Sequence, residues 1–175
     1  MKAHILATGP SMSAELADRI YVDKCESGDV VIAVNDAVFL APWADAICAQ
    51  DVAWWQHHSR PLAEFKGQKF SSNKIGGATP VDCPIDGTGM NSGGFGIFVA
   101  CKYFAARDIY LHGFDMQGTH FFGPHTGRCL KNTDPTRRKT FQWQFAELRK
   151  YLEARGVRVH NLTPNSALEA FPWEP

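Results

Sequence analysis

Three residues in the second half of the chain have types and a spacing that could support catalysis. Asp115 is followed by His120 and then by His125, at steps of five residues. An imidazole can act as a general base near neutral pH, and a carboxylate with two imidazoles can hold a divalent metal ion. We therefore predict catalysis or metal binding here, although Asp115 could instead cap a turn and either histidine could be an exposed loop residue.

Two glycine-containing turns, each before a helical stretch, could bind an anion. They are Thr8-Gly9-Pro10-Ser11 and Asn91-Ser92-Gly93-Gly94. Backbone N–H groups at a helix N-terminus favour a phosphate. Neither turn matches the dinucleotide fingerprint or the Walker loop, so a dinucleotide oxidoreductase or a P-loop enzyme is not expected. A plain strand-to-helix turn would also explain the first, and Asn91 could simply cap a helix.

Basic and aromatic residues near the two histidines could contact a ligand. Arg128 and Lys131 could close over an anionic substrate, although charged loop residues are usually only solvated. Phe121 and Phe122 could stack on a planar ring, although aromatic residues are core by default. Of the remaining histidines, the pair at 57–58 is expected to be solvated.

The elements that must position these residues alternate between short apolar strands and helical stretches. This alternation is typical of a layered α/β domain with a mainly parallel sheet. We predict strands within Ala3–Thr8, Asp29–Val34, Ala46–Ala49, Lys66–Asn73, Asp108–Leu111 and Val157–Asn161. Ligands of open α/β sheets bind outside the carboxyl ends of the strands. Three such ends carry polar residues: Thr8–Ser11, Asn35-Asp36 and Gln50-Asp51.

The helical stretches and two irregular stretches complete the prediction. Helices are predicted over Met12–Ile20 with Ser11 or Ser13 as N-cap, over Val52–Phe65 with a break at Pro61, over Ile97–Ala106, and over Arg137–Ala154. The stretch from Ile75 to Gly89 is predicted to be a long loop. Residues 116–136 are predicted to form an irregular lid.

Composition argues against several classes of protein. The 18 Lys and Arg residues balance 18 Asp and Glu residues, and the longest basic cluster is Arg137-Arg138-Lys139, so a nucleic-acid binder is not expected. With no run of about 18 apolar residues and no signal-peptide layout, we expect a soluble, cytoplasmic protein without a membrane span. The five cysteines form no Cys-x-x-Cys pair and are expected to be reduced thiols.

Five short motifs together resemble a known superfamily. They are Leu6–Ser11, Val34–Asp36, Asn91–Gly93, Ile109–Asp115 and Leu162–Leu168. In this order they are similar to the bacterial family 42 sialyltransferases and to related Rossmann-like proteins of phage and bacterial genomes, which include archaeal-type hydroxymethylpterin pyrophosphokinases. The resemblance covers most of the chain and is to a short, phage-type member. It implies one Rossmann-like, three-layer, nucleotide-binding domain over residues 1–175.

The resemblance also implies an activity and residue roles. In the sialyltransferases the matching turns hold the nucleotide part of the donor, and a lid histidine deprotonates the acceptor hydroxyl without a metal. This implies a glycosyltransferase-like transferase that uses a nucleotide or nucleotide-sugar. His125 or His120 would be the base, because Cys129 stands where that histidine is expected, and Asp115 would line the site. The expected nucleotide-binding residues are Gly9, Pro10, Ser11, Asn35, Asp36, Asn91, Ser92 and Gly93.

Two alternatives remain open at this point. The spacing of Asp115, His120 and His125 suits a phosphoryl or pyrophosphoryl transferase that uses Mg²⁺ or another divalent metal. No tyrosine lies between Tyr110 and Tyr151 to contact a donor phosphate. A non-catalytic nucleotide-binding or host-interaction protein of a phage is therefore the other alternative. A homo-oligomer is compatible with each of them.

Overall fold

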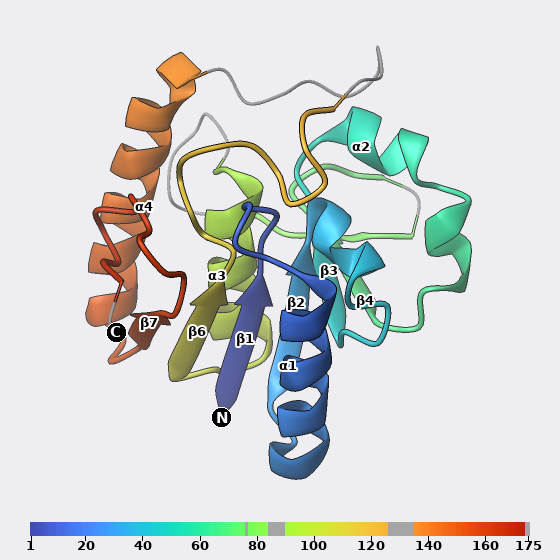
Figure 1. Cartoon of the computed structure of the whole chain (residues 1–175), viewed down its shortest axis with the longest axis horizontal. Coiled ribbons are helices and arrows are strands. Elements are labelled where there is room, and N and C mark those ends of the chain that lie inside the picture. Colours follow the sequence, from blue (N-terminus) through green and yellow to red (C-terminus); the bar gives the residue numbers. More distant parts are fainter. Residues whose placement is uncertain (76, 84–89, 126–134, 174–175) are drawn as a thin grey trace.

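Seven parallel strands form one sheet in the computed structural model, which describes residues 1–75, 77–83, 90–125 and 135–173 (Figure 1). The strands are β1 (Lys2–Leu6), β2 (Val30–Val34), β3 (Ala46–Cys48), β4 (Gln68–Ser71), β5 (Thr79–Pro80), β6 (Asp108–His112) and β7 (Arg158–Asn161). Their order across the sheet is β5-β4-β3-β2-β1-β6-β7, and every pair is parallel. The predicted α/β class with a mainly parallel sheet is confirmed.

Helices cover both faces of this sheet and give three layers. Four α-helices are described: α1 (Ala14–Ser27), α2 (Val52–His57), α3 (Ser92–Tyr103) and α4 (Arg138–Glu153). Three short 3₁₀ helices are η1 (Asn35–Phe39), η2 (Pro61–Glu64) and η3 (Pro135–Arg137). One buried cluster joins α3 and α4 to the sheet, and a second joins α1, η1 and α2 to it. This is the Rossmann-like arrangement.

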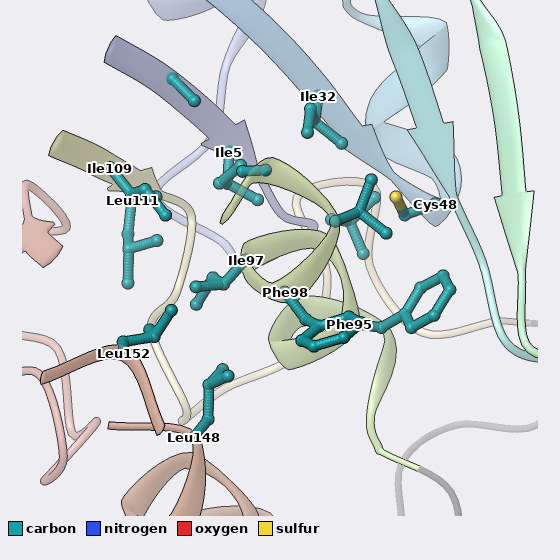
Figure 2. Close-up of a cluster of buried hydrophobic side chains, with 14 of the residues drawn as sticks. Ile5, Ile32, Cys48, Phe95, Ile97, Phe98, Ile109, Leu111, Leu148 and Leu152 are labelled. Atoms are coloured by element: carbon teal, nitrogen blue, oxygen red, sulfur yellow. The ribbon is translucent and has the colours of Figure 1, made fainter. Parts of the chain in front are cut away.

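The first of these clusters is built from β-branched residues of the sheet and aromatic residues of a helix. Figure 2 shows Ile5 and Ile32 of the sheet facing Phe95 and Phe98 of α3, all of them buried. Gly96 allows this close approach, because a Cβ there would lie 3.0 Å from Val34 Cγ2 and 3.3 Å from Ile5 Cγ2. Helix α3 therefore lies tightly against β1 and β2.

Two helices extend beyond the predicted bounds. Helix α1 begins after Ser13, whose hydroxyl accepts from Leu16 N, and runs to Ser27 instead of stopping near Ile20. It ends at Gly28, which has φ 71° and donates its N–H to the Lys24 carbonyl. The predicted helix ends too early because the last two turns of α1 are largely exposed and carry no continuous apolar stripe. Helix α3 begins at Ser92, so its glycines are helical and do not form a loop before Ile97.

The order of the strands determines where a ligand site is expected. From β1 the chain moves outward through β2, β3 and β4 to β5, and then returns through α3 to β6 on the other side of β1. The carboxyl ends of the central strands thus face loops that come from both directions. Strand β5 lies in the stretch predicted to be a loop and consists of only two residues paired with β4. None of the helices in the described ranges has both the length and the apolarity of a membrane span.

Candidate functional site

The segment of residues 116–125 crosses the carboxyl edge of the sheet. It leaves the end of β6 and arches over the end of β1 toward α2 (Figure 1). Two contacts hold it to Thr8: Phe121 N donates to the Thr8 carbonyl at 2.9 Å, and the Thr8 hydroxyl lies 2.9 Å from His120 Nδ1. Of the predicted lid, residues 116–125 are described and are irregular as expected, whereas the described residues 135–136 belong to η3.

Both histidines of this segment lie together, with an aromatic side chain against them. The ring centroids of His120 and His125 are 4.8 Å apart. Phe122 stacks on His120 at 4.9 Å with an angle of 6° between the ring planes, and it also contacts His125 at 5.0 Å. Burial is the main cause that lowers the pKa of His120, and repulsion by His125 lowers it further, while Asp36 and a hydrogen bond to Thr8 raise it. His120 is therefore neutral at pH 7 and can accept a proton.

A third imidazole, that of His58, belongs to the same group. Its Nε2 lies 3.2 Å from Asp36 Oδ1, and its ring contacts Trp54 with centroids 4.8 Å apart. Burial lowers the pKa of His58, Asp36 raises it, and His57 and His125 lower it. We call His58, His120 and His125 the imidazole cluster. The expectation that both histidines at 57–58 are solvated is wrong for His58, whose side chain is only 13% exposed.

The signal for His58 was present in the sequence as a helical spacing. Trp54 and His58 are four residues apart, so they lie on one face of α2 and its last turn. That face meets Asp36, whose Oδ2 accepts a 3.0 Å hydrogen bond from Trp54 Nε1. Asp36, predicted to bind the nucleotide, is thus a buried carboxylate that contacts an indole and an imidazole.

Asn35 has the clearest features of a ligand-binding residue at the strand ends. It follows β2 with φ 51°, a left-handed conformation that is costly for a residue with a side chain. Its side-chain Oδ1 is buried and has no hydrogen-bond partner among the residues that the structure describes. A strained backbone and an unsatisfied buried acceptor in one residue are typical of a binding site.

Gln50, at the end of β3, carries a second unsatisfied group. Its Nε2 is buried without a hydrogen-bond partner in the described ranges, whereas its Oε1 accepts from Ser72 N at 3.1 Å and from the Ser72 hydroxyl. Its backbone N donates to the Ser92 hydroxyl oxygen at 3.2 Å, so Ser92 can still donate its proton. The sequence indicated Gln50 only as part of a polar strand end.

The first glycine turn already holds an anionic group of the protein itself. Ser11 donates from its N to Asp115 Oδ1 at 3.2 Å and from its hydroxyl to Asp115 Oδ2 at 2.8 Å. Gly9 donates to the Gly113 carbonyl at 2.9 Å, and a Cβ at Gly9 would overlap the Asp115 carboxylate. Pro10 lies against Gly118. The carboxylate of Asp115 thus takes the place that we predicted for a phosphate.

The second glycine turn is used mainly by the fold. Asn91 caps α3, because its Oδ1 accepts from Gly94 N at 2.9 Å, and its Nδ2 donates to Gln144 Oε1 at 3.1 Å. Gly93 gives room for a ring, since a Cβ there would lie 2.9 Å from Phe114 Cε1. Ser92 differs from these two residues, because within the described residues its hydroxyl proton is not donated to another group and can be donated to a ligand.

Two further predictions concern basic residues that would bind the substrate and a metal ion that would assist the reaction. Arg128 and Lys131, with Cys129, lie outside the described residues. Within the described ranges, no group of three or more His, Cys, Asp or Glu side chains is arranged to hold a metal ion. Asp115 directs its carboxylate to Ser11, as above.

Comparisons of the chain with protein-family models, with curated proteins and with solved structures gave no significant match.

Proposed function

We propose that this protein binds a nucleotide-activated donor, such as a nucleotide-sugar, at the carboxyl edge of its sheet and transfers the activated group to an acceptor hydroxyl. The supporting observation is the pair of His120 and His125, of which His120 is bonded to Thr8, beside strand ends that carry unsatisfied polar groups. The resemblance to glycosyltransferases of Rossmann-like fold gives the class of reaction. The contact between His120 and His125 supports one of them as the general base.

His120 or His125 accepts the proton in this reaction. The acceptor O–H bond breaks as its proton passes to an imidazole nitrogen, and the acceptor oxygen forms a bond to the anomeric carbon of the donor. The bond between that carbon and the phosphate oxygen breaks, and the nucleotide leaves with its electron pair. A base with a lowered pKa is in its active, neutral form at pH 7.

The uncharged part of the nucleotide suits the ends of β2 and β3. Asn35 Oδ1 can accept a hydrogen bond from a ribose hydroxyl or a base N–H, and Gln50 Nε2 can donate one. Ser92 adds a hydroxyl at the start of α3. The buried carboxylate of Asp36 would repel a phosphate, so we expect the phosphate to lie away from η1.

Calorimetric titration with CMP, UMP, GMP and ATP tests the proposal. We expect one of these nucleotides to bind, with affinity unchanged when EDTA is added. Incubation with a nucleotide-sugar of the same base should release the nucleotide, and this release should be lost in His120→Gln combined with His125→Gln. The matched control is His160→Gln, which removes an imidazole on β7.

Three outcomes would count against the proposal. Absence of binding by all four nucleotides overturns it. Binding without any release of nucleotide favours a non-catalytic binding protein. Release that requires a divalent metal favours the metal-dependent phosphoryl transfer alternative.

A further inference from the structure

We propose that Asp36 and His58 form a pair behind the general base, and that the charge of this pair stabilises the proton that the base takes from the acceptor. This inference rests on the proposed function for its role in a reaction. The arrangement consists of two contacts, that of Asp36 with His58 and that of His120 with His125. The charge of Asp36 acts on His120, and that of His125 acts on His58.

Asp36 is fixed in place and cannot turn to solvent without losing a buried hydrogen bond. It is 9% exposed and lies in η1, directly after β2. Trp54 holds its Oδ2, and Trp54 is itself buried against Trp55 with a perpendicular ring contact. A carboxylate that is held this way supplies a fixed negative charge in a region of low dielectric constant.

His58 is placed to use that charge. Its Nε2 is buried and lies 3.2 Å from Asp36 Oδ1, yet it has no aligned hydrogen-bond partner in the described ranges. Phe39, on the far end of η1, packs on the same ring with centroids 5.0 Å apart and limits its movement. His58 is therefore held next to Asp36 with an unsatisfied nitrogen.

The charges around the cluster favour the uptake of one proton and oppose a second. Within the described residues, the titratable groups that act on it are Asp36 from η1, His57 from the end of α2, and the cluster's own imidazoles. When all imidazoles are neutral, Asp36 gives the group one negative charge. The first proton neutralises that charge, while a second would repel the first.

The pair acts through other groups and is therefore a positioning pair. The acceptor proton moves to His120 or His125, where an N–H bond forms, and Asp36 remains ionised throughout. Its negative charge stabilises the imidazolium, which raises the basicity of the base.

Titration of the histidine rings by NMR tests this without any nucleotide. The spectra of the full chain labelled with ¹⁵N histidine give a midpoint for each ring. In Asp36→Asn we expect the midpoints of His58 and His120 to fall by about one pH unit, since the opposite charge is lost. The matched control is Asp29→Asn, which removes the carboxylate 3.8 Å from His4 and should change only the titration of rings near His4.

A second variant keeps the inference testable if Asp36→Asn does not fold. Trp54→Phe removes the N–H donor and keeps an aromatic ring, so the negative charge of the Asp36 carboxylate is no longer shared with the indole N–H. The midpoints of His58 and His120 should then rise. If the midpoints stay within about 0.2 pH units of wild type in whichever of these variants folds, the inference is overturned.

The outcomes separate this inference from the proposed function. If the midpoints move as stated and no nucleotide binds, the pair stands and the transferase proposal fails. If a nucleotide binds and is released while the midpoints do not move, the inference alone fails. In an active enzyme, Asp36→Asn should also shift the acidic limb of the kcat/KM profile to lower pH, which a purely structural role of Asp36 would not do.

Discussion

The hydroxyl of Thr8 lies 2.9 Å from Nδ1 of His120, although the two residues are 112 positions apart in the chain. This contact joins the end of β1 to the segment that crosses the carboxyl edge of the sheet. The neighbouring bond from Phe121 N to the Thr8 carbonyl fixes the backbone at the same point. A segment that the sequence predicts to be part of an irregular lid is thus held at the place where an α/β sheet binds its ligands.

Replacing Thr8 with Val tests this contact. The change keeps the shape of the side chain and removes the hydroxyl, so the ring of His120 loses its partner. We expect the free energy of unfolding to fall by about 1 kcal/mol, and the ¹⁵N shifts of the His120 ring to change toward a mixture of tautomers. Thr140→Val, at an exposed position of α4, is the control and should change neither. Unaltered ring shifts in Thr8→Val would contradict the contact.

The bond between Ser11 and Asp115 predicts a loss of stability. In Asp115→Ala, the N–H and the hydroxyl of Ser11 lose the carboxylate that they share, in a site where Asp115 is buried. We expect the free energy of unfolding in urea to fall by about 1–3 kcal/mol. Asp18→Ala, at an exposed position of α1, should stay within about 0.5 kcal/mol of wild type. Equal effects of the two substitutions would show that Asp115 is not needed to hold the turn.

The strain at Asn35 predicts opposite effects on stability and on binding. Asn35→Gly relieves the left-handed backbone and removes the unsatisfied Oδ1, so stability should be unchanged or rise by up to about 1 kcal/mol. The affinity for the nucleotide should fall about tenfold, the equivalent of one hydrogen bond. Asn165→Gly is the matched control, because Asn165 has φ 55° but is exposed. Full affinity in Asn35→Gly would remove Asn35 from the site.

His112 predicts a loss of stability in acid. Burial, with repulsion from His4, lowers the pKa of His112 from 6.5 to about 3, and His4 Nδ1 lies 3.1 Å from its Nε2. The unfolded chain therefore binds more protons than the folded chain between about pH 3 and pH 6.5. The free energy of unfolding therefore has its full value above pH 6.5. Between pH 6.5 and about pH 3 it falls by up to about 1.4 kcal/mol for each pH unit.

Urea unfolding of wild type and His112→Gln at pH 7.5 and 5 measures that effect. We expect the substituted protein to lose less stability between the two pH values than wild type does. His160→Gln, on the neighbouring strand, serves as the control and should keep the wild-type dependence. A wild-type dependence in His112→Gln would assign the acid sensitivity to other groups.

The fold could be predicted from the sequence, and much of the site could not. Alternating apolar strands and helices set the sheet, because burial on both faces leaves a strong local pattern. Hydrogen-bond partners leave no such pattern. Ser11 meets Asp115 across 104 positions, so nothing local shows that the first glycine turn is already occupied. The helical spacing from Trp54 could have placed His58 on a buried face, but its partner Asp36 lies on another element and could not be predicted.

Polar strand ends were the part of the site that sequence patterns did indicate. Asn35 and Gln50 were both found as residues that follow apolar strands, and both carry unsatisfied buried groups in the structure. The periodicity gives their position at the carboxyl edge but not which of their atoms remains unpaired. That distinction depends on packing, and it separates Asn35 from Asn91, whose side-chain oxygen and nitrogen both have a hydrogen-bond partner.

The measurement that tests the central claim most directly is a nucleotide titration followed by NMR on the ¹⁵N-labelled chain, with CMP, UMP, GMP and ATP added in turn. The account predicts that one of them shifts the resonances of Thr8, Asn35, Gln50, Ser92 and the His120 ring, and leaves those of Tyr110 and His160 on the sheet unchanged. Shifts confined to other parts of the chain, or no shifts with any of the four, would contradict a nucleotide site at the carboxyl edge of the sheet.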